Sequence, residues 1–197
     1  MQETRNKDDS LWKDFRNGDD TALYKLYDLY ADALLGFGMH FSRDTGLLKD
    51  CIHDLFLDLF KYRNSLSYTD NVKFYMFKSL KRKIQKELSK KSLFDSDSDS
   101  KSLQGEAVPS YDEVIIETEI EQENFKRLRQ AVDKLPCQQQ EALFLKFQQD
   151  LSYQQIAQIQ NISIESARTN IYRAIKALRQ SFENGPIPLP LFLMLPY

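Results

Sequence analysis

Residues 163–176 carry side chains that can read the edges of DNA bases. Arginine and asparagine can form paired hydrogen bonds with base edges, and serine and threonine can reach bases or phosphates. Here they alternate with apolar residues at helical spacing, so they would share the outward face of one helix. The candidate contacts to DNA are Ser163, Glu165, Ser166, Arg168, Thr169, Asn170, Arg173 and Lys176.

The residues before this face have the features of a helix-turn-helix. Pro136 would open the first of three short helices, because proline is tolerated at the first helical position. Ser152 suits an N-cap, with Gln155 three residues later as in a capping box. Asn161 can take the left-handed conformation that the turn needs, and Ser163 would cap the helix that follows. A single such helix is more often an ordinary amphipathic helix with a solvated basic face, but the small Ala157 and the polar turn favour DNA binding.

The composition allows one or two domains and places the charges in blocks of opposite sign. The chain has 197 residues, 42% of them hydrophobic, and a formal net charge of −2. A protein that binds DNA by itself is usually basic. Residues 73–91 hold eight Lys or Arg and one acid, whereas residues 95–123 hold ten Asp or Glu and one base. Any nucleic-acid surface must therefore be local.

Several classes of function find no support in the sequence. Two cysteines and two histidines show no metal-ligand spacing. We therefore expect no catalytic residue, no metal and no cofactor, and two buried free thiols. The N-terminus is charged, with no signal peptide, and no apolar run approaches the ~20 residues that span a bilayer. The sequence predicts a cytoplasmic protein without stable membrane insertion.

Apolar periodicity predicts an all-α fold of two small helical domains joined by a flexible acidic linker. A short amphipathic helix contains Leu11, Trp12 and Phe15, and longer helices are expected over residues 21–41, 47–62 and 72–91. Helix resumes near Tyr111. The second domain would be a helix-turn-helix, winged-helix-like DNA-binding domain. The predicted boundaries are 1–91 for the first domain, 92–111 for the linker, 112–182 for the second domain and 183–197 for a tail.

The helix predicted over residues 47–62 has two outward rows of unlike chemistry. Asp50, Asp54 and Asp58 are four residues apart and would stack on one side. Because like charges at this spacing are mildly unfavourable in an isolated helix, the row suggests a surface for another protein. A solvated acidic face is the alternative. The neighbouring row consists of His53, Leu57 and Lys61.

The helix predicted over residues 72–91 combines basic and aromatic side chains. Phosphate attraction together with base stacking is how proteins hold single-stranded nucleic acid. Alternatively, Phe77 and Tyr75 belong to the core and the lysines are only solvated. The candidate contacts are Phe74, Tyr75, Lys78, Lys81, Arg82 and Lys86.

These motifs together resemble the extracytoplasmic-function (ECF) group of bacterial RNA polymerase sigma factors. Residues 54–60 (DLFLDLF) are similar to the family's clamp-binding helix, with His53 and Asp54 where the family usually has Gln-Glu. Residues 73–82 (KFYMFKSLKR) are similar to the segment that melts and reads the minus-ten element. Residues 151–157 (LSYQQIA) match the domain for the minus-thirty-five element. The turn has Gln-Asn in place of the usual glycine.

The resemblance implies a protein that binds core RNA polymerase and directs promoter-specific initiation. It assigns polymerase binding to Asp50, His53, Asp54, Leu57, Asp58 and Lys61. Promoter DNA is the second partner, and an anti-sigma factor is implied by the resemblance only. A stand-alone helix-turn-helix regulator is the alternative, although the dimer and ligand pocket that it would need are not visible in the sequence.

The last thirteen residues (GPIPLPLFLMLPY) are apolar and rich in proline. They are too short and too broken for a membrane helix. Since an exposed apolar run favours aggregation, we expect docking on the chain's own domains or on a partner. A frayed terminus is the alternative.

Overall fold

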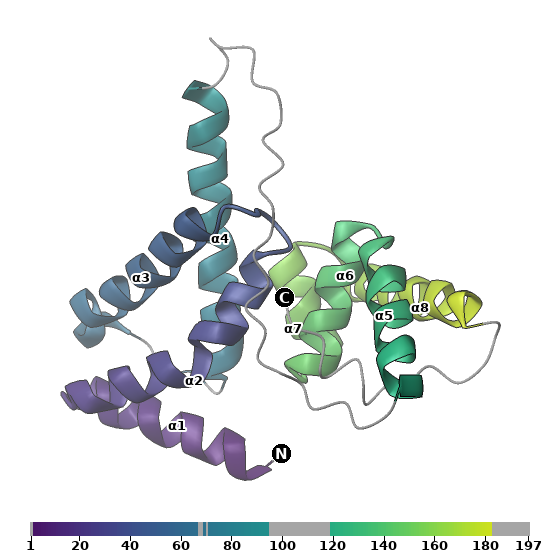
Figure 1. The fold of residues 1–197 in the computed structure, drawn as a ribbon. Coiled ribbons are helices and arrows are strands. Elements are labelled where there is room, and N and C mark those ends of the chain that lie inside the picture. Colours follow the sequence, from purple (N-terminus) through teal and green to yellow (C-terminus); the bar gives the residue numbers. More distant parts are fainter. Residues whose placement is uncertain (1, 67–68, 70, 95–118, 183–197) are drawn as a thin grey trace. The chain divides into compact units, whose positions relative to one another are not determined.

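The computed structural model describes residues 2–66, 69, 71–94 and 119–182, with side chains described for residues 8–66, 69, 71–91 and 123–182. It divides the chain into two compact units, residues 1–107 and 108–197. The described residues form α-helices and two short irregular helical turns, with no strand among them (Figure 1). The expected all-α fold is confirmed.

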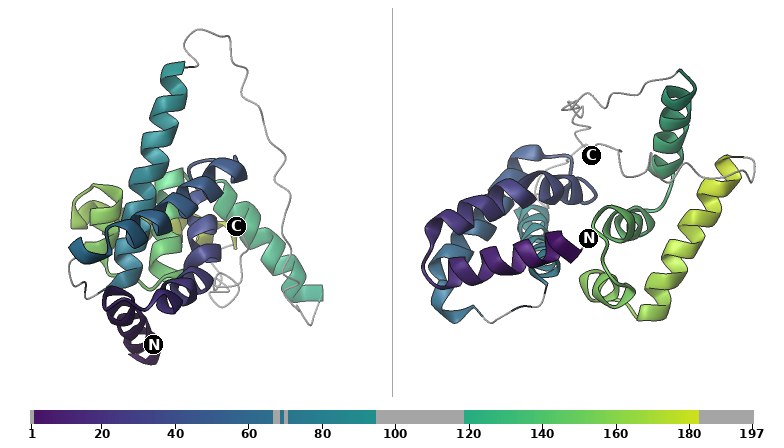
Figure 2. Two further views of the ribbon diagram at one scale, coloured as in Figure 1. Left: turned by 90° about the vertical axis from the view of Figure 1, so that its left-hand side faces the viewer. Right: turned by 90° about the horizontal axis from the view of Figure 1, so that it is seen from below.

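The first unit is built from four α-helices. α2 packs against α1, α3 and α4, and α3 packs against α4. In Figures 1 and 2, α1 and α2 lie against each other and α4 is the long helix of the unit. The elements are α1 (Gln2–Arg16), α2 (Asp20–Gly38), α3 (Thr45–Lys61), the 3-10 turn η1 (Arg63–Ser65) and α4 (Val72–Phe94).

The core of the first unit is filled by large apolar side chains from all four helices. Phe37 of α2 and Phe77 of α4 meet edge to face with ring centroids 5.1 Å apart. α2 and α3 approach closely at Gly38, where an added Cβ would lie 2.9 Å from the Leu48 side chain. Fully buried members include Trp12, Phe15, Leu26, Leu34, Leu48, Leu55, Leu59, Met76 and Leu80.

Polar side chains cap the helices of this unit. Asp19 accepts a hydrogen bond from the Thr21 amide at 2.8 Å, and Asp44 accepts one from the Leu47 amide at 3.1 Å. The Thr21 hydroxyl, which donates to Asp19 at 2.7 Å, and the Thr21 amide lower the pKa of the Asp19 carboxyl, and the Leu47 amide lowers the pKa of Asp44. Asn71 accepts from the Phe74 amide at 2.7 Å at the start of α4. Each cap satisfies an amide that the first helical turn leaves without a partner.

The described part of the second unit contains four α-helices and one π-helical turn. α8 packs against α5, α6 and α7, and Figure 2 shows it as one straight helix. A π-helical turn inserts an extra residue into the turn and is common at functional sites. The elements are α5 (Glu119–Asp133), α6 (Cys137–Leu143), the π turn η3 (Phe144–Gln148), α7 (Tyr153–Gln160) and α8 (Ile164–Ser181).

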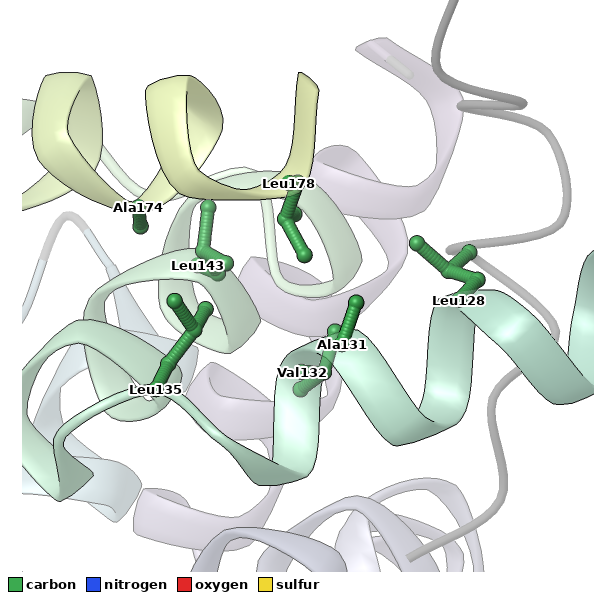
Figure 3. Close-up of a cluster of buried hydrophobic side chains, with 7 residues drawn as sticks. All are labelled: Leu128, Ala131, Val132, Leu135, Leu143, Ala174 and Leu178. Atoms are coloured by element: carbon green, nitrogen blue, oxygen red, sulfur yellow. The ribbon is translucent and has the colours of Figure 1, made fainter. Parts of the chain in front are cut away.

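A cluster of seven buried apolar residues joins three helices of the second unit (Figure 3). Leu143 of α6 lies between Leu135 and the α8 residues Ala174 and Leu178. The two alanines of the cluster let the helices approach closely. The remaining members are Leu128, Ala131 and Val132 of α5.

Several sequence predictions need correction in detail. Pro136 is the N-cap of α6 rather than its first residue. Cys51 is buried as expected, but Cys137 is exposed because it occupies the first turn of α6. α4 continues to Phe94, beyond the predicted end at Lys91. Most of the predicted linker, the predicted helix start near residue 111 and the whole tail 183–197 lie outside the described residues.

No helix in the described part of the chain combines the length and the apolar character that crossing a bilayer requires.

We predict that Leu143→Ala destabilises the second unit by about 2–5 kcal/mol, because it removes a fully buried side chain at the junction of three helices. Circular dichroism during denaturant unfolding measures this. The single tryptophan, Trp12, lies in the core of the first unit and reports on that unit separately. An unchanged circular dichroism transition would contradict the assigned core.

Candidate nucleic-acid and protein interfaces

The turn between α7 and α8 has the geometry that a helix-turn-helix requires. Ser152 and Gln155 form a reciprocal capping box at the start of α7. Asn161 ends α7 in the left-handed conformation, with φ 56° and ψ 46°. Ser163 then caps α8 by accepting a hydrogen bond from the Ser166 amide at 3.1 Å. All three local predictions from the sequence are confirmed.

The predicted outward face of α8 is exposed. Its buried stripe consists of Ala167, Ile171, Ala174 and Leu178, as the periodicity predicted, while Ile175 is half-buried. Asn170 is half-buried. The other predicted contacts to DNA are exposed: Ser163, Glu165, Ser166, Arg168, Thr169, Arg173 and Lys176.

Three hydroxyl groups on this face already make local hydrogen bonds. The Ser163 hydroxyl donates to the Ser166 oxygen at 3.0 Å, and the Thr169 hydroxyl donates to the Glu165 carbonyl at 2.8 Å. Ser163 therefore acts first as the cap of α8. The arginine and lysine side chains are better suited to reach DNA.

Sequence reasoning missed two tyrosines near this face. Tyr172 is 66% exposed and lies four residues after Arg168 and four before Lys176, so helical spacing alone could have identified it. Tyr153 begins α7, and its ring centroid lies 5.6 Å from the guanidinium carbon of Arg168. This second contact joins different helices, so no local pattern predicts it.

The basic and aromatic face of α4 is only partly as predicted. Arg82 and Lys86 are exposed, and Lys78 lies with its amino group 5.0 Å from the centroid of the half-buried Phe74 ring. Tyr75 packs against Trp12 at a centroid distance of 5.4 Å, so its ring contributes to the packing of α4 against α1.

The prediction that Lys81 presents its charge to DNA is wrong for the described structure. Lys81 is only 6% exposed, and its amino group lies 5.2 Å from the centroid of the Phe41 ring. The reason is helical spacing. Lys81 follows Phe77 by four residues and precedes Ile84 by three, so it falls on the buried stripe of α4.

An apolar groove of about 500 Å³ lies between α2 and α3. Tyr24 is 72% exposed and Leu57 is 50% exposed, although large apolar side chains are usually buried. Helical spacing from the buried Phe56 would place Phe60 near the apolar stripe of α3, yet Phe60 is 52% exposed at the groove, whereas Leu59 is buried. The groove is lined chiefly by Leu23, Tyr24, Tyr27, His53, Leu57 and Phe60.

The predicted acidic row runs along α3 beside this groove. Asp50, Asp54 and Asp58 are exposed, as are His53, Leu57 and Lys61. Asp58 accepts a hydrogen bond from the Lys83 amino group at 2.5 Å, which partly neutralises the row. The surface thus pairs an apolar groove with carboxylates, a combination that suits a basic amphipathic partner.

Arg63 fixes one end of the groove. It pairs with Asp20, and its guanidinium carbon lies 4.9 Å from the Phe15 ring centroid and 5.0 Å from that of Phe60. The side chain thereby connects α1, α2 and α3 just after α3 ends. Sequence reasoning missed it because its partners are distant in sequence.

No residue of either interface has the surroundings of a metal site. Among the described residues there is no group of three or more His, Cys, Asp or Glu side chains that could hold a metal ion.

Comparison with known proteins identifies the second unit. Residues 125–178, which contain the helix-turn-helix, match the family described as Sigma-70, region 4. No curated protein matches this chain.

Solved structures show the same fold over most of the chain. The sigma factor RpoE from Bartonella quintana, solved in complex with the anti-sigma factor NepR, is 19% identical with a TM-score of 0.63, covering 81% of this chain and 96% of that one. CnrH, solved in complex with the cytosolic domain of CnrY, is 14% identical with a TM-score of 0.57, covering 91% and 99%. The resemblance to ECF sigma factors is confirmed by the region 4 match and by this fold.

We predict that Arg63→Ala destabilises the first unit by about 1–2 kcal/mol, because it removes an ion pair and two contacts between a cation and aromatic rings. Trp12 fluorescence during denaturant unfolding measures the change. The exposed Arg43 gives the matched control, for which Arg43→Ala should stay close to the wild-type transition. If Arg63→Ala and Arg43→Ala unfolded at the same denaturant concentration, the role given to Arg63 would be contradicted.

Proposed function

We propose that this chain is a sigma factor that binds core RNA polymerase through its first unit and selects promoters through both units. The observation that carries the proposal is the capped, exposed helix α8 within a region 4 domain. Its outward face would lie in the major groove of the minus-thirty-five element, as the second helix of a helix-turn-helix does. The function is binding and requires no enzymatic step.

We assign two binding functions to the first unit, each on a different face. The groove and the acidic row of α3 would dock on the polymerase. Phe74, Lys78, Arg82 and Lys86 of α4 would hold the unpaired minus-ten strand by stacking and phosphate attraction. Melting would follow from preferential binding of the open strand, which shifts an existing equilibrium. Lys81 is left out of this set because it is buried.

The near-neutral net charge is compatible with this function. Most of the affinity for DNA would come from polymerase, so the chain does not need a strongly basic surface of its own. We place the protein in the cytoplasm with the polymerase. The RpoE structure named above is a complex with an anti-sigma factor, and we propose that an anti-sigma factor regulates this chain too.

We predict that Arg168→Ala weakens specific promoter binding by the holoenzyme by about 1–3 kcal/mol, as for the loss of one base contact. Competition binding with matched and mismatched promoters measures it. Lys126→Ala, which removes an exposed charge from α5, is the control and should leave the specificity ratio unchanged. Unaltered specificity in Arg168→Ala would refute the contact.

We predict that Asp54→Ala lowers affinity for core polymerase several-fold, because it removes an exposed carboxylate from the docking face. Quantitative pull-down with core enzyme measures the effect. Asp14→Ala provides a control on α1 that is equally exposed but lies on another helix. If both variants bind as the wild type does, polymerase docking lies on another face.

If the chain were instead a stand-alone regulator, it would bind its site tightly without polymerase. Gel-shift measurements with and without core enzyme separate these functions.

A further inference from the structure

Tyr153 brings together two cations from different parts of the second unit. The Arg168 guanidinium carbon lies 5.6 Å from the ring centroid, and the Lys146 amino group lies 5.2 Å from it. Tyr153 belongs to α7, Arg168 to α8 and Lys146 to the π turn η3. Lys146 also donates a hydrogen bond to the Leu151 carbonyl at 3.3 Å. The ring therefore connects the turn before the helix-turn-helix to the face proposed to read DNA.

Contact with an aromatic ring restrains a long side chain that is otherwise free in solvent. Arg168 is exposed, and an exposed arginine loses rotamer freedom when it binds a base. A contact that holds the guanidinium beforehand reduces this loss. A guanidinium that stacks by its planar face also keeps its in-plane N–H donors available for a paired contact.

We propose that Tyr153 is a positioning residue that holds Arg168 for paired hydrogen bonds to a guanine in the upstream promoter element. Guanine fits because its O6 and N7 atoms present two adjacent acceptors in the major groove. The inference rests on the proposed function. It adds the base that Arg168 contacts and the residue that positions Arg168.

Lys146 has a different task in the same cluster. Its ammonium group is a compact charge without the two parallel N–H donors of a guanidinium, so it suits a phosphate rather than a base edge. Loss of Lys146 should weaken binding to all sequences alike and reduce its salt dependence, whereas loss of the Tyr153 ring should change sequence preference.

The test uses the full chain with core polymerase and a pool of promoter duplexes randomised in the upstream element. The readout is the enrichment of guanine over the other bases at each position. Tyr153→Leu should lower the guanine preference about two- to fivefold, the loss expected for one contact between a cation and a ring at an exposed site. Tyr153→Phe keeps the ring and should retain the preference. In the Arg168→Ala background, Tyr153→Leu should cause no further loss.

The outcomes separate this inference from the proposed function. If Arg168→Ala keeps the wild-type guanine preference, the proposed contact of Arg168 with DNA fails. If Arg168→Ala loses it but Tyr153→Leu keeps it, only the positioning role fails. Should Tyr153→Leu unfold, NMR of the wild-type chain still decides. The side-chain protons of Arg168 should show an upfield ring-current shift that persists in Tyr153→Phe, and its absence would overturn the inference.

Discussion

The rest of this structure depends on the burial of a single apolar stripe by each helix. In α8 the stripe at Ala167, Ile171, Ala174 and Leu178 is fixed against α5, α6 and α7, so the opposite face must point to solvent. The same constraint in α3 buries Leu55 and Leu59 and leaves Asp54 and Leu57 exposed. The residues proposed to bind DNA and polymerase therefore lie on the faces that the cores do not use.

Small residues and caps determine how closely the helices can approach. Gly38 allows α2 to meet Leu48 of α3, and Ala174 does the same for α8 beside Leu143. The left-handed Asn161 supplies the turn without glycine, because asparagine tolerates this conformation better than most residues. These local features fix which face of α8 is exposed.

The sequence was sufficient to predict the helices, the caps of α7 and α8 and the exposed face of α8, because these follow from local spacing. It was insufficient where contacts join distant residues. The ring of Tyr153 beside Arg168, and Arg63 between Phe15 and Phe60, depend on how helices pack. The misplacement of Lys81 has a different cause: its charge suggested exposure, yet its spacing from Phe77 and Ile84 placed it on the buried side.

The central claim is that this chain gives promoter specificity to core RNA polymerase. In vitro transcription by core enzyme on a library of random DNA fragments, with and without the wild-type chain, tests it most directly when the 5′ ends of the transcripts are sequenced. The account predicts start sites that depend on the chain and share two upstream elements at a fixed separation. Start sites identical to those of core enzyme alone would contradict it.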